Sequence, residues 1–593
     1  MKTVFHLFCL FISIAIHAQI IPTSNRVEWY SAGCQNPFPE PQLIANIMDF
    51  GAFGDGINND APAVNSAIAS LNGHYGLVFF PPGTYLLQTG ISLPDSIIIR
   101  GAGADSSYIK INNSGSCFGI YGSASGVFTN ILSGFNKDSE KITVSDVLIF
   151  ANGDNVEIRQ DNGSWDSNPA TWAVKVVGQI SKISNIIGDT LFLEDKLRIN
   201  FDTTLNLEIQ KILPKKQISI ECLNIERTDT STAGTGYNLE FFYAINCRVK
   251  GVESNKSQGS HCMINLSSHI EVIGSYFHDA YLYDGSGTKG YGVTLNSHSG
   301  LCLIQNNIFK HLRHAMMTKA GANGNVFGYN YSIDVFRNGA GEFPADYGGD
   351  ISLHGHYSFA NLFEGNIVQN LQIDNYWGPS GPYNTFFRNR VEHYGIYMST
   401  TNTNNSNFVG NEIIGSFPYG FYTITGAGNF EFGNNKNGTI TPSGTSNLND
   451  VSYYLQSLPS FWNISYNWPS IGISNLINSG TIPAKQRYLS NMFTECSDNP
   501  ITEIFENNSL SAVEVSPNPA FNFISINILS KKNTNSIISI ININGQVLKE
   551  VSFNNLLEGK TKKEINISEL SKGIYFIRLT TDLISNYQKF IKL

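Results

Sequence analysis

The phrase NNIF at 306–309 returns as NVFGYN at 325–330, NLFEGN at 361–366, NTFFRN at 384–389, NFVGN at 407–411 and FEFGN at 430–434. Its closing asparagines are Asn307, Asn330, Asn366, Asn389, Asn411 and Asn434, which lie 23, 36, 23, 22 and 23 residues apart. A repeat of this length predicts the coils of a β-solenoid, which stack because one coil is too short to bury its own apolar face. The interval of 36 residues indicates a loop of 13 extra residues between two coils.

Asparagine at the same place in every coil predicts a structural role for that residue. Asn tolerates the left-handed backbone conformation better than most non-glycine residues, so we expect these asparagines to form the sharp turns between strands. Stacked Asn side chains also hydrogen-bond to one another, and we expect such bonds along the solenoid.

Composition favours an exported, β-rich protein. Of the 593 residues, 14% are charged, 12% are aromatic and 54 are glycine, which suits β structure better than helix. Residues 1–18 combine Lys2, an apolar core and a small residue at the end, as a secretory signal peptide does. No later run of 18 residues is apolar enough to span a membrane, and the net charge of −9 without a basic stripe argues against a nucleic-acid partner. We expect a secreted monomer whose cysteines are mostly buried as small hydrophobic side chains.

Residues 46–103 hold the most specific motif. Asp60 and Pro62 begin a predicted helix that covers the open end of the stack, where bare strand edges would invite aggregation. The runs VFF, YLL and IIIR, separated by PPG and LPD, are typical of short strands and corners.

This segment resembles the amino-terminal signature of the pectate lyase superfamily of right-handed parallel β-helices. The residues that carry the resemblance are Asp49-Phe50-Gly51-Ala52, Gly54-Asp55-Gly56, Asp60, Ala67-Ile68, Pro81-Pro82-Gly83-Thr84-Tyr85 and Gly101-Ala102-Gly103. The resemblance implies an all-β fold and polysaccharide lyase or glycoside hydrolase activity, although the superfamily also holds members without known activity. It further implies that Asp49, Asp55 and Asp60 belong to the scaffold.

Two other segments depart from the coil pattern. Alternating runs at 135–215 predict a small inserted β-domain, in which we expect Trp165 and Trp172 to pack in the core rather than bind carbohydrate. Alternating runs with Asn-Gly and Lys-Gly turns at 511–593 predict a β-sandwich. The chain is thus predicted to divide into a signal peptide (1–18), a cap with the first coils (19–134), the inserted domain (135–215), further coils (216–484), a linker (485–510) and the sandwich (511–593).

The terminal sandwich resembles the type A sorting domain of the type IX secretion system of the Bacteroidota. The matching residues are Pro517-Asn518-Pro519, Asn544-Gly545-Gln546, Leu570-Ser571-Lys572-Gly573-Ile574-Tyr575 and Lys589-Phe590-Ile591-Lys592-Leu593. The resemblance implies that the type IX machinery is a partner, and that the protein is secreted or held at the outer-membrane surface of a Gram-negative bacterium.

A column of polar residues marks the candidate site. Four residues past the closing asparagines lie His311, Asp334, Asn370 and His393, and aligning SYFHDA at 275–280 with NNIFKH adds Asp279. Neighbouring coils lie about 4.8 Å apart, so Asp279, His311 and Asp334 are predicted to stack where a sugar chain can lie along them. Nine of the 12 histidines fall between 261 and 393, which also indicates a site.

Two insertions flank this column, at 280–290 and 337–350, and loops on one face of a repeat protein commonly wall a binding surface. We therefore predict catalytic roles for His311, Asp334, Arg313 and Asp279, and substrate contacts for His278, His314, Lys319, Arg337, Asp346, Asp350, His354 and Trp377.

These residue types fit two reactions on an anionic plant or algal glycan. A β-eliminating lyase needs a base, here His311 or His314. It also needs a cation to stabilise the enolate, and the candidates are Arg313, Lys319 and Arg337. A glycoside hydrolase needs two carboxylates, which Asp334 can supply with Asp279 or a loop acid. A non-catalytic adhesin or glycan-binding solenoid is the alternative to both. No cofactor is predicted, although the oxygen-rich loop at 342–350 leaves a Ca²⁺ site open.

Overall fold

The computed structural model describes residues 19–229, 236–285, 287–338, 348–399, 401–473, 477, 479–496, 510–530, 534–542, 546–556, 559–581 and 584–593. The predicted signal peptide lies outside these residues.

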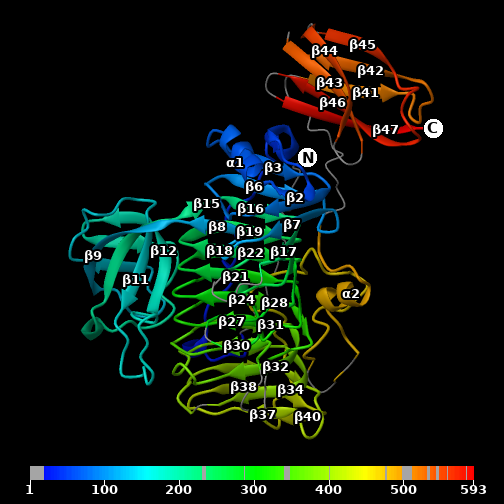
Figure 1. Cartoon of the computed structure of the whole chain (residues 1–593). Coiled ribbons are helices and arrows are strands. Elements are labelled where there is room, and N and C mark those ends of the chain that lie inside the picture. Colours follow the sequence, from blue (N-terminus) through cyan, green and yellow to red (C-terminus); the bar gives the residue numbers. More distant parts are fainter. Residues whose placement is uncertain are drawn as a thin grey trace, which may run out of the picture.

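The central body is a right-handed parallel β-helix, as predicted (Figure 1). One of its long sheets contains β1 (Leu43–Asn46), β3 (Gly76–Phe80), β6 (Ile97–Gly101), β16 (Ile218–Glu221), β19 (Ala244–Lys250), β22 (Ser268–Ile273), β25 (Leu303–Gln305), β28 (Val326–Gly328), β31 (Leu362–Glu364), β33 (Thr385–Phe387), β35 (Asn407–Val409) and β38 (Phe430–Phe432). Each strand pairs in parallel with the strand one coil away, so equivalent residues of successive coils lie side by side.

The remaining strands of the coils form a second, larger sheet system. Its amino-terminal part holds β2 (Asp55–Asn59), β4 (Gly83–Leu87), β5 (Ile91–Ser92), β7 (Ser107–Ile111), β8 (Phe118–Tyr121), β17 (Asn224–Arg227), β18 (Leu239–Phe242) and β20 (Glu253–Asn255). The later coils add β21 (Ser260–Asn265), β23 (Tyr276–His278), β24 (Tyr291–Asn296), β26 (Ile308–Lys310), β27 (His314–Thr318), β29 (Tyr331–Ile333), β30 (Ile351–Leu353), β32 (Ile367–Ile373), β34 (Arg390–Met398), β36 (Glu412–Ile413), β37 (Phe421–Thr423), β39 (Asn434–Lys436) and β40 (Thr439–Thr441).

The closing asparagines form a buried ladder that runs through the coils. Asn330 Nδ2 donates to Asn366 Oδ1 (3.0 Å), and Asn366 Nδ2 donates to Asn389 Oδ1 (2.9 Å). The predicted hydrogen bonding is confirmed, but the predicted left-handed turn at these asparagines is wrong. The left-handed residue is the one before, such as Tyr329 at φ 54° or Arg388 at φ 52°. The asparagine itself points inward, where its amide satisfies backbone groups of the neighbouring coils.

Aromatic side chains stack inside the coils in the same register. The ring centroids of Phe327 and Phe363 lie 4.9 Å apart, those of Phe363 and Phe386 5.2 Å, and those of Phe386 and Phe408 5.0 Å. All four are fully buried, so each coil contributes one rung to a continuous apolar core.

The predicted helix is α1 (Ala61–Ser70), which packs on the first coil at one end of the solenoid (Figure 1). The Asp60 side chain does not cap this helix, although Asp60 stands at the N-cap. Its buried carboxylate instead accepts hydrogen bonds from the backbone N–H groups of Phe53 (2.6 Å) and Leu86 (3.2 Å). Asp60 therefore ties the helix to the first coils.

A closed β-barrel lies beside the solenoid (Figure 1) and is formed by β9 (Ser123–Ser133), β10 (Lys141–Val144), β11 (Asn155–Gln160), β12 (Val177–Ile187), β13 (Thr190–Leu193) and β14 (Glu208–Leu213). It begins at Ser123 rather than at 135, because β9 pairs with both β10 and β14 and so closes the barrel. The chain enters the barrel at Gly122 and leaves it at Leu213, and these two residues lie side by side. A Cβ on Gly122 would lie 2.8 Å from the carbonyl oxygen of Leu213.

The described residues after the last coil, 442–473, 477 and 479–496, return along the solenoid as a strap that includes α2 (Pro483–Leu489). Lys485 forms an ion pair with Glu392, and the ring of Phe493 stacks on Tyr276 at 4.8 Å. The predicted linker at 485–510 is therefore wrong up to residue 496, because apolar and charged side chains of this segment have partners on the coils. Residues 497–509 lie outside the described residues.

Glu364 holds this strap to β31. Its Oε2 accepts a hydrogen bond from the backbone N–H of Tyr453 (2.8 Å), and burial raises the pKa of this carboxyl to about 7. Because its pKa is higher in the folded state, the stability it contributes is present below the ordinary glutamate pKa of about 4.5 and is lost as the pH rises through 7. We expect Glu364→Gln to remove about 3 kcal/mol of the stability difference between pH 4 and pH 8. Denaturant unfolding of both proteins at these two pH values measures it, and equal pH dependence would contradict it.

The carboxyl-terminal residues form two antiparallel sheets, as a β-sandwich requires. One holds β41 (Leu510–Ser516), β42 (Phe523–Ser530) and β45 (Gly559–Asn566), and the other holds β43 (Thr534–Asn542), β44 (Val547–Leu556), β46 (Gly573–Thr581) and β47 (Ile584–Lys592). Buried side chains of both sheets, including Ile526, Ile540 and Phe590, form one apolar cluster. Among the described residues, no helix is long and apolar enough to cross a membrane.

Candidate functional site

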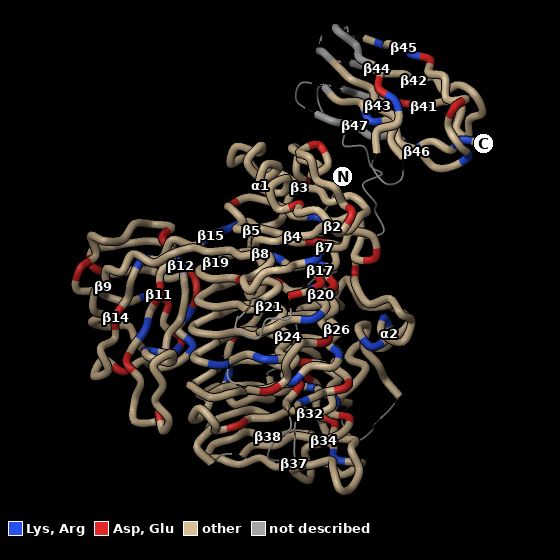
Figure 2. The backbone as a smooth tube through the Cα atoms, viewed as in Figure 1, with Lys and Arg blue, Asp and Glu red and all other residues tan. Residues whose placement is uncertain are grey.

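The predicted polar column exists on the outer surface of the solenoid. Asp279, His311 and Asp334 each follow one of three strands that pair in register, β23, β26 and β29. All three adopt the left-handed conformation, with φ of 59°, 52° and 59°. This conformation turns the chain sharply at one corner of successive coils, where Asp334 is exposed and Asp279 and His311 are partly exposed. In Figure 2, acidic and basic segments lie close together beside β20 and β26 in this region.

His278 lies beside the column and is bonded on both ring nitrogens. Nδ1 contacts Asp279 Oδ2 (2.8 Å) and Nε2 contacts Glu253 Oε1 (3.1 Å). Burial acts to lower the pKa of His278, but the bonds to the two carboxylates outweigh it and raise that pKa. In turn, the hydrogen bond from His278 lowers the pKa of Asp279. Asp279 is therefore an ionised carboxylate, and His278 has no free nitrogen with which to accept a proton.

His311 is arranged differently, because only one of its nitrogens contacts a described residue. Its Nδ1 donates to Asp334 Oδ2 (2.8 Å), since a carboxylate can only accept. In the neutral ring, Nε2 therefore carries the free lone pair. The ring stacks on Phe336 at 4.5 Å and meets the edge of Tyr283 at 5.1 Å, so its plane is held by aromatic walls.

Two arginines meet Asp284 next to the column. Arg337 Nη2 donates to Asp284 Oδ1 (3.0 Å), and Arg313 Nη1 lies 3.7 Å from the same oxygen. Arg313 is the more buried of the two, and its Nε and Nη1 make no hydrogen bond to a described residue. A buried guanidinium with unused donors is costly unless an anion completes its bonding.

His314 begins β27, three residues after His311, and directly follows Arg313 in the chain. Its ring packs edge-on against Tyr291 at 4.6 Å, and its Nδ1 accepts a hydrogen bond from the backbone N–H of Gly349 (3.0 Å). Burial lowers the pKa of His314 well below its ordinary range, with the charge of Arg313 acting in the same direction. His314 is thus a neutral, buried ring that supports the site.

A second cluster lies at the far end of β27. Lys319 and His354 follow the paired residues Thr318 and Leu353, so they sit side by side on adjacent coils. His354 Nδ1 donates to Asp374 Oδ2 (2.6 Å), which makes a second histidine–aspartate pair. Asp374 occupies the next coil, only 20 residues after His354. Counting with the usual repeat of 23 residues therefore does not align the two.

An aromatic ring from the barrel faces Lys319. Its Nζ lies 5.0 Å from the ring centroid of Trp172, and burial lowers the pKa of the Lys319 ammonium to about 8. Trp172 comes from the barrel, is 44% exposed and meets Trp377 edge-to-face at 5.2 Å. The expectation that Trp172 packs in the barrel core is therefore wrong, whereas Trp165 does pack, against Tyr357 at 4.7 Å.

The barrel is held firmly enough to position Trp172. Barrel residue Glu157 accepts a hydrogen bond from His298 Nδ1 (2.8 Å), and both side chains are buried. Arg198 Nη1 donates to Asn323 Oδ1 (2.7 Å), again from barrel to solenoid. Buried polar contacts of this kind fix geometry, because leaving either partner unpaired is costly.

If Trp172 and Trp377 hold a sugar ring, Trp172→Ala should raise KM about tenfold with little change in kcat, because stacking against an aromatic face contributes about 1–1.5 kcal/mol. The matched control is Phe128→Ala, which removes another barrel aromatic that also faces a cation, Arg159 at 4.1 Å. Steady-state kinetics on a polysaccharide substrate measures both. Equal KM for the two variants would contradict a role for Trp172 in binding.

One predicted loop acid, Asp350, does not join the site. Asp350 is 1% exposed, accepts hydrogen bonds from Ser332 Oγ (2.7 Å) and from the backbone N–H of Gln369 (2.6 Å), and so fastens one coil to the next. Burial raises the pKa of Asp350 to about 6. It holds backbone rather than sugar, which corrects the prediction. Asp346, with residues 339–347, lies outside the described residues.

The described residues contain no group of three or more His, Cys, Asp or Glu side chains that converge as metal ligands. Most of the loop at 342–350, where a calcium site was left open, lies beyond the described part of the chain.

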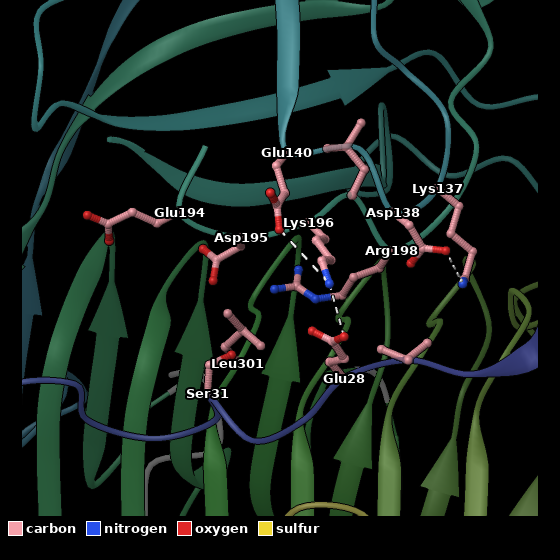
Figure 3. A pocket seen from close by; sticks show the side chains of 12 residues that line it. Glu28, Ser31, Lys137, Asp138, Glu140, Glu194, Asp195, Lys196, Arg198 and Leu301 are labelled. Carbon is pink, nitrogen blue, oxygen red and sulfur yellow. Dashed lines mark hydrogen bonds and ion pairs between the residues drawn. The ribbon is translucent and has the colours of Figure 1, made fainter. Parts of the chain in front are cut away.

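A cavity of about 210 Å³ lies elsewhere, between the amino-terminal segment and the barrel (Figure 3). It is lined by Val27, Glu28, Ser31, Lys137, Asp138, Glu140, Glu194, Asp195, Lys196, Leu197, Arg198 and Leu301. Its charges are largely paired, for example Lys196 with Glu28 at 3.0 Å and Lys137 with Asp138 at 2.9 Å. It contains none of the predicted site residues, and we interpret it as the junction at which the barrel rests on the coils.

Two families match this chain. Residues 44–197 match the family described as rhamnogalacturonase A/epimerase, pectate lyase-like, and residues 514–593 match the secretion system C-terminal sorting domain. The chain carries a pectate-lyase-like domain and a secretion sorting domain. The sorting domain is the address read by the type IX secretion machinery, so the protein is extracellular or held at the cell surface.

Several curated proteins match this chain over short stretches. Mannuronan C5-epimerase AlgE3 of Azotobacter vinelandii is 30% identical over 126 residues, which are 20% of this chain and 6% of the epimerase. The preneck appendage protein of Bacillus phage PZA is 35% identical over 74 residues, 12% of this chain and 8% of that protein. The chain thus covers only a small part of either relative. Among solved structures, the tailspike gp61 of Pseudomonas phage phi297 aligns with a TM-score of 0.43 and 15% identity, over 66% of this chain and 65% of that one.

Proposed function

We propose that this protein is an exported polysaccharide lyase that removes the proton beside the carboxylate of a uronic acid and cleaves the chain by β-elimination. One observation carries the proposal. The His311–Asp334 pair, with a free Nε2, lies two residues from the buried and incompletely bonded Arg313. A base and a cation are the two groups that this reaction needs.

The roles follow from the contacts. Nε2 of His311 takes the proton, and Asp334 holds the ring in the right tautomer and stabilises the imidazolium that forms. Arg313, together with the more exposed Arg337, supplies positive charge to the uronic carboxylate, whose charge grows as the enolate forms. Breaking the glycosidic bond at the adjacent carbon then leaves an unsaturated sugar end.

The carboxylates of the site suit this reaction better than hydrolysis. Hydrolysis needs a protonated carboxyl group to donate to the leaving oxygen. The hydrogen bond from His278 lowers the pKa of Asp279, which keeps that group ionised, and Asp334 accepts from His311. Asp350 has a raised pKa but is buried beneath the surface.

The second cluster extends the binding surface. Lys319 offers a positive charge, and Trp172 and Trp377 offer apolar faces, which together suit a polymer whose sugars carry carboxylates. The preferred substrate class is therefore a polyuronate. The sorting domain supports a reaction outside the cell, and we propose that the cell is a Gram-negative bacterium.

C5 epimerisation is the second candidate, and the matches to mannuronan C5-epimerases and to the rhamnogalacturonase A/epimerase family favour it. It begins with the same proton removal but returns a proton to the opposite face of the ring. His311 and Arg313 keep the same roles, and the glycosidic bond stays intact.

Incubation with a panel of polyuronates in D₂O separates these candidates. β-Elimination should give new ultraviolet absorbance from unsaturated ends. Deuterium at C5 without chain cleavage would favour the epimerase. New reducing ends without absorbance would overturn both, and no change in any polymer would favour a binding protein.

A further inference from the structure

Two cysteines meet where the strap ends. Cys222 occupies the corner directly after β16, in the left-handed conformation at φ 53°. On the next two coils the same corner is held by Gly251 and Gly274, since Glu221 pairs with Lys250 and Lys250 with Ile273. These corners form a second column, on a different edge of the solenoid from His311.

The strap runs along this column and stops at the coil of Cys222. Glu495 Oε1 accepts a hydrogen bond from Asn306 Nδ2 (2.7 Å), and the Glu495 backbone N–H donates to Gly274 O (2.7 Å). The thiol of Cys496 then donates to Gly251 O (3.3 Å). A Cβ on Gly274 would lie 2.6 Å from Cβ of Glu495, so glycine there lets the strap approach.

We propose that Cys222 and Cys496 form a disulfide bond in the exported protein. Cys496 lies against Gly251, whose corner is one coil from that of Cys222, and both side chains are partly exposed, so an oxidant can reach them. The sorting domain sends the chain out of the reducing cytoplasm. Disulfides persist in the more oxidising environment outside. The bond would fasten the strap, just before residues 497–509, to an early coil of the solenoid.

Thiol–disulfide exchange forms this bond in two steps. The Cys496 thiolate attacks a sulfur of an oxidant of the disulfide class and expels one of its thiolates. Cys222 then loses its proton and attacks the Cys496 sulfur of the mixed disulfide, which expels the second thiolate. Two protein thiols are oxidised and one external disulfide is reduced to two thiols.

The other described cysteines lack this arrangement. The Cys34 thiol donates to the carbonyl oxygen of Cys247 (3.2 Å) rather than to its sulfur. Cys117, Cys262 and Cys302 are buried in the apolar core, as most of the cysteines were expected to be. This inference is independent of the proposed reaction at His311.

The test is peptide mapping of the exported protein, alkylated during purification without reductant. We expect one linked peptide pair that joins Cys222 to Cys496 and separates on reduction. In Cys222→Ser, Cys496 should become open to alkylation, whereas the control Cys34→Ser should keep the linked pair. Unlinked Cys222 and Cys496 in the wild-type protein, or a bond from either to another cysteine, would overturn the proposal. Mapping of the wild-type protein decides the question even if a variant does not fold.

Discussion

Replacing His311 by Gln should lower kcat on a polyuronate by about 10²–10⁴, because the loss of a positioned base usually costs that much. KM should change little, since Arg313 and the cluster around Lys319 remain. Asp334→Asn should also lower kcat by at least about 10², because an amide can hydrogen-bond either tautomer of the ring and cannot stabilise the imidazolium. Initial rates of absorbance increase, with circular dichroism to check the fold, measure both variants.

The matched control is His393→Gln. His393 lies at the same place in its coil, four residues after a closing asparagine, but its ring packs against Tyr394 and Tyr419 rather than against a carboxylate. It should retain full activity. If His311→Gln and Asp334→Asn also retained it while folded, the proposed site would be wrong.

Asn366→Ala should destabilise the solenoid by about 3–5 kcal/mol, the largest loss of stability that we expect from a single side chain. Asn366 Oδ1 accepts from both the backbone N–H (2.9 Å) and the Nδ2 (3.0 Å) of Asn330, and its Nδ2 donates to Phe327 O (2.9 Å). Alanine removes all of these bonds, at about 1–3 kcal/mol for each buried group left without a partner, whereas Asn330 Nδ2 keeps its bond to Ile304 O (2.8 Å). The midpoint of guanidinium unfolding should fall accordingly.

Asn404→Ala provides the comparison for the ladder. Asn404 accepts one hydrogen bond, from the Ala427 backbone N–H (2.7 Å), near the surface, so water can replace it. Its removal should cost at most about 1 kcal/mol. Equal unfolding midpoints for the two variants would show that the buried ladder adds nothing to stability.

The solenoid was predictable because the spacing of the asparagines sets the length of a coil, and the coil length sets which residues stack. The same counting placed Asp279, His311 and Asp334 at one corner. It could not tell which of two adjacent residues makes the turn and which points inward. Burial decides this, because an inward Asn can bond four groups of its neighbours while Tyr329 or Arg388 turns the chain.

Contacts between distant segments were harder to predict. Trp172 reaches the solenoid only because the barrel docks there, and no repeat connects it with Lys319 or Trp377. Asp284, which contacts Arg313, lies in the insertion at 280–290, and counting residues from coil to coil cannot place a residue of an insertion. Asp350 looked like its acidic neighbours in sequence, yet it lies beneath the surface, and only packing distinguishes a buried acid from an exposed one.

The narrow neck of the barrel, where Gly122 meets Leu213, has an evolutionary consequence. A module whose two ends emerge together can be gained, lost or exchanged without altering the pitch of the coils that flank it. Because this module also carries Trp172 to the surface near Lys319, exchanging it would alter the proposed binding surface while His311, Asp334 and Arg313 stayed where they are. Related solenoids would in this way differ in substrate specificity through the inserted barrel alone.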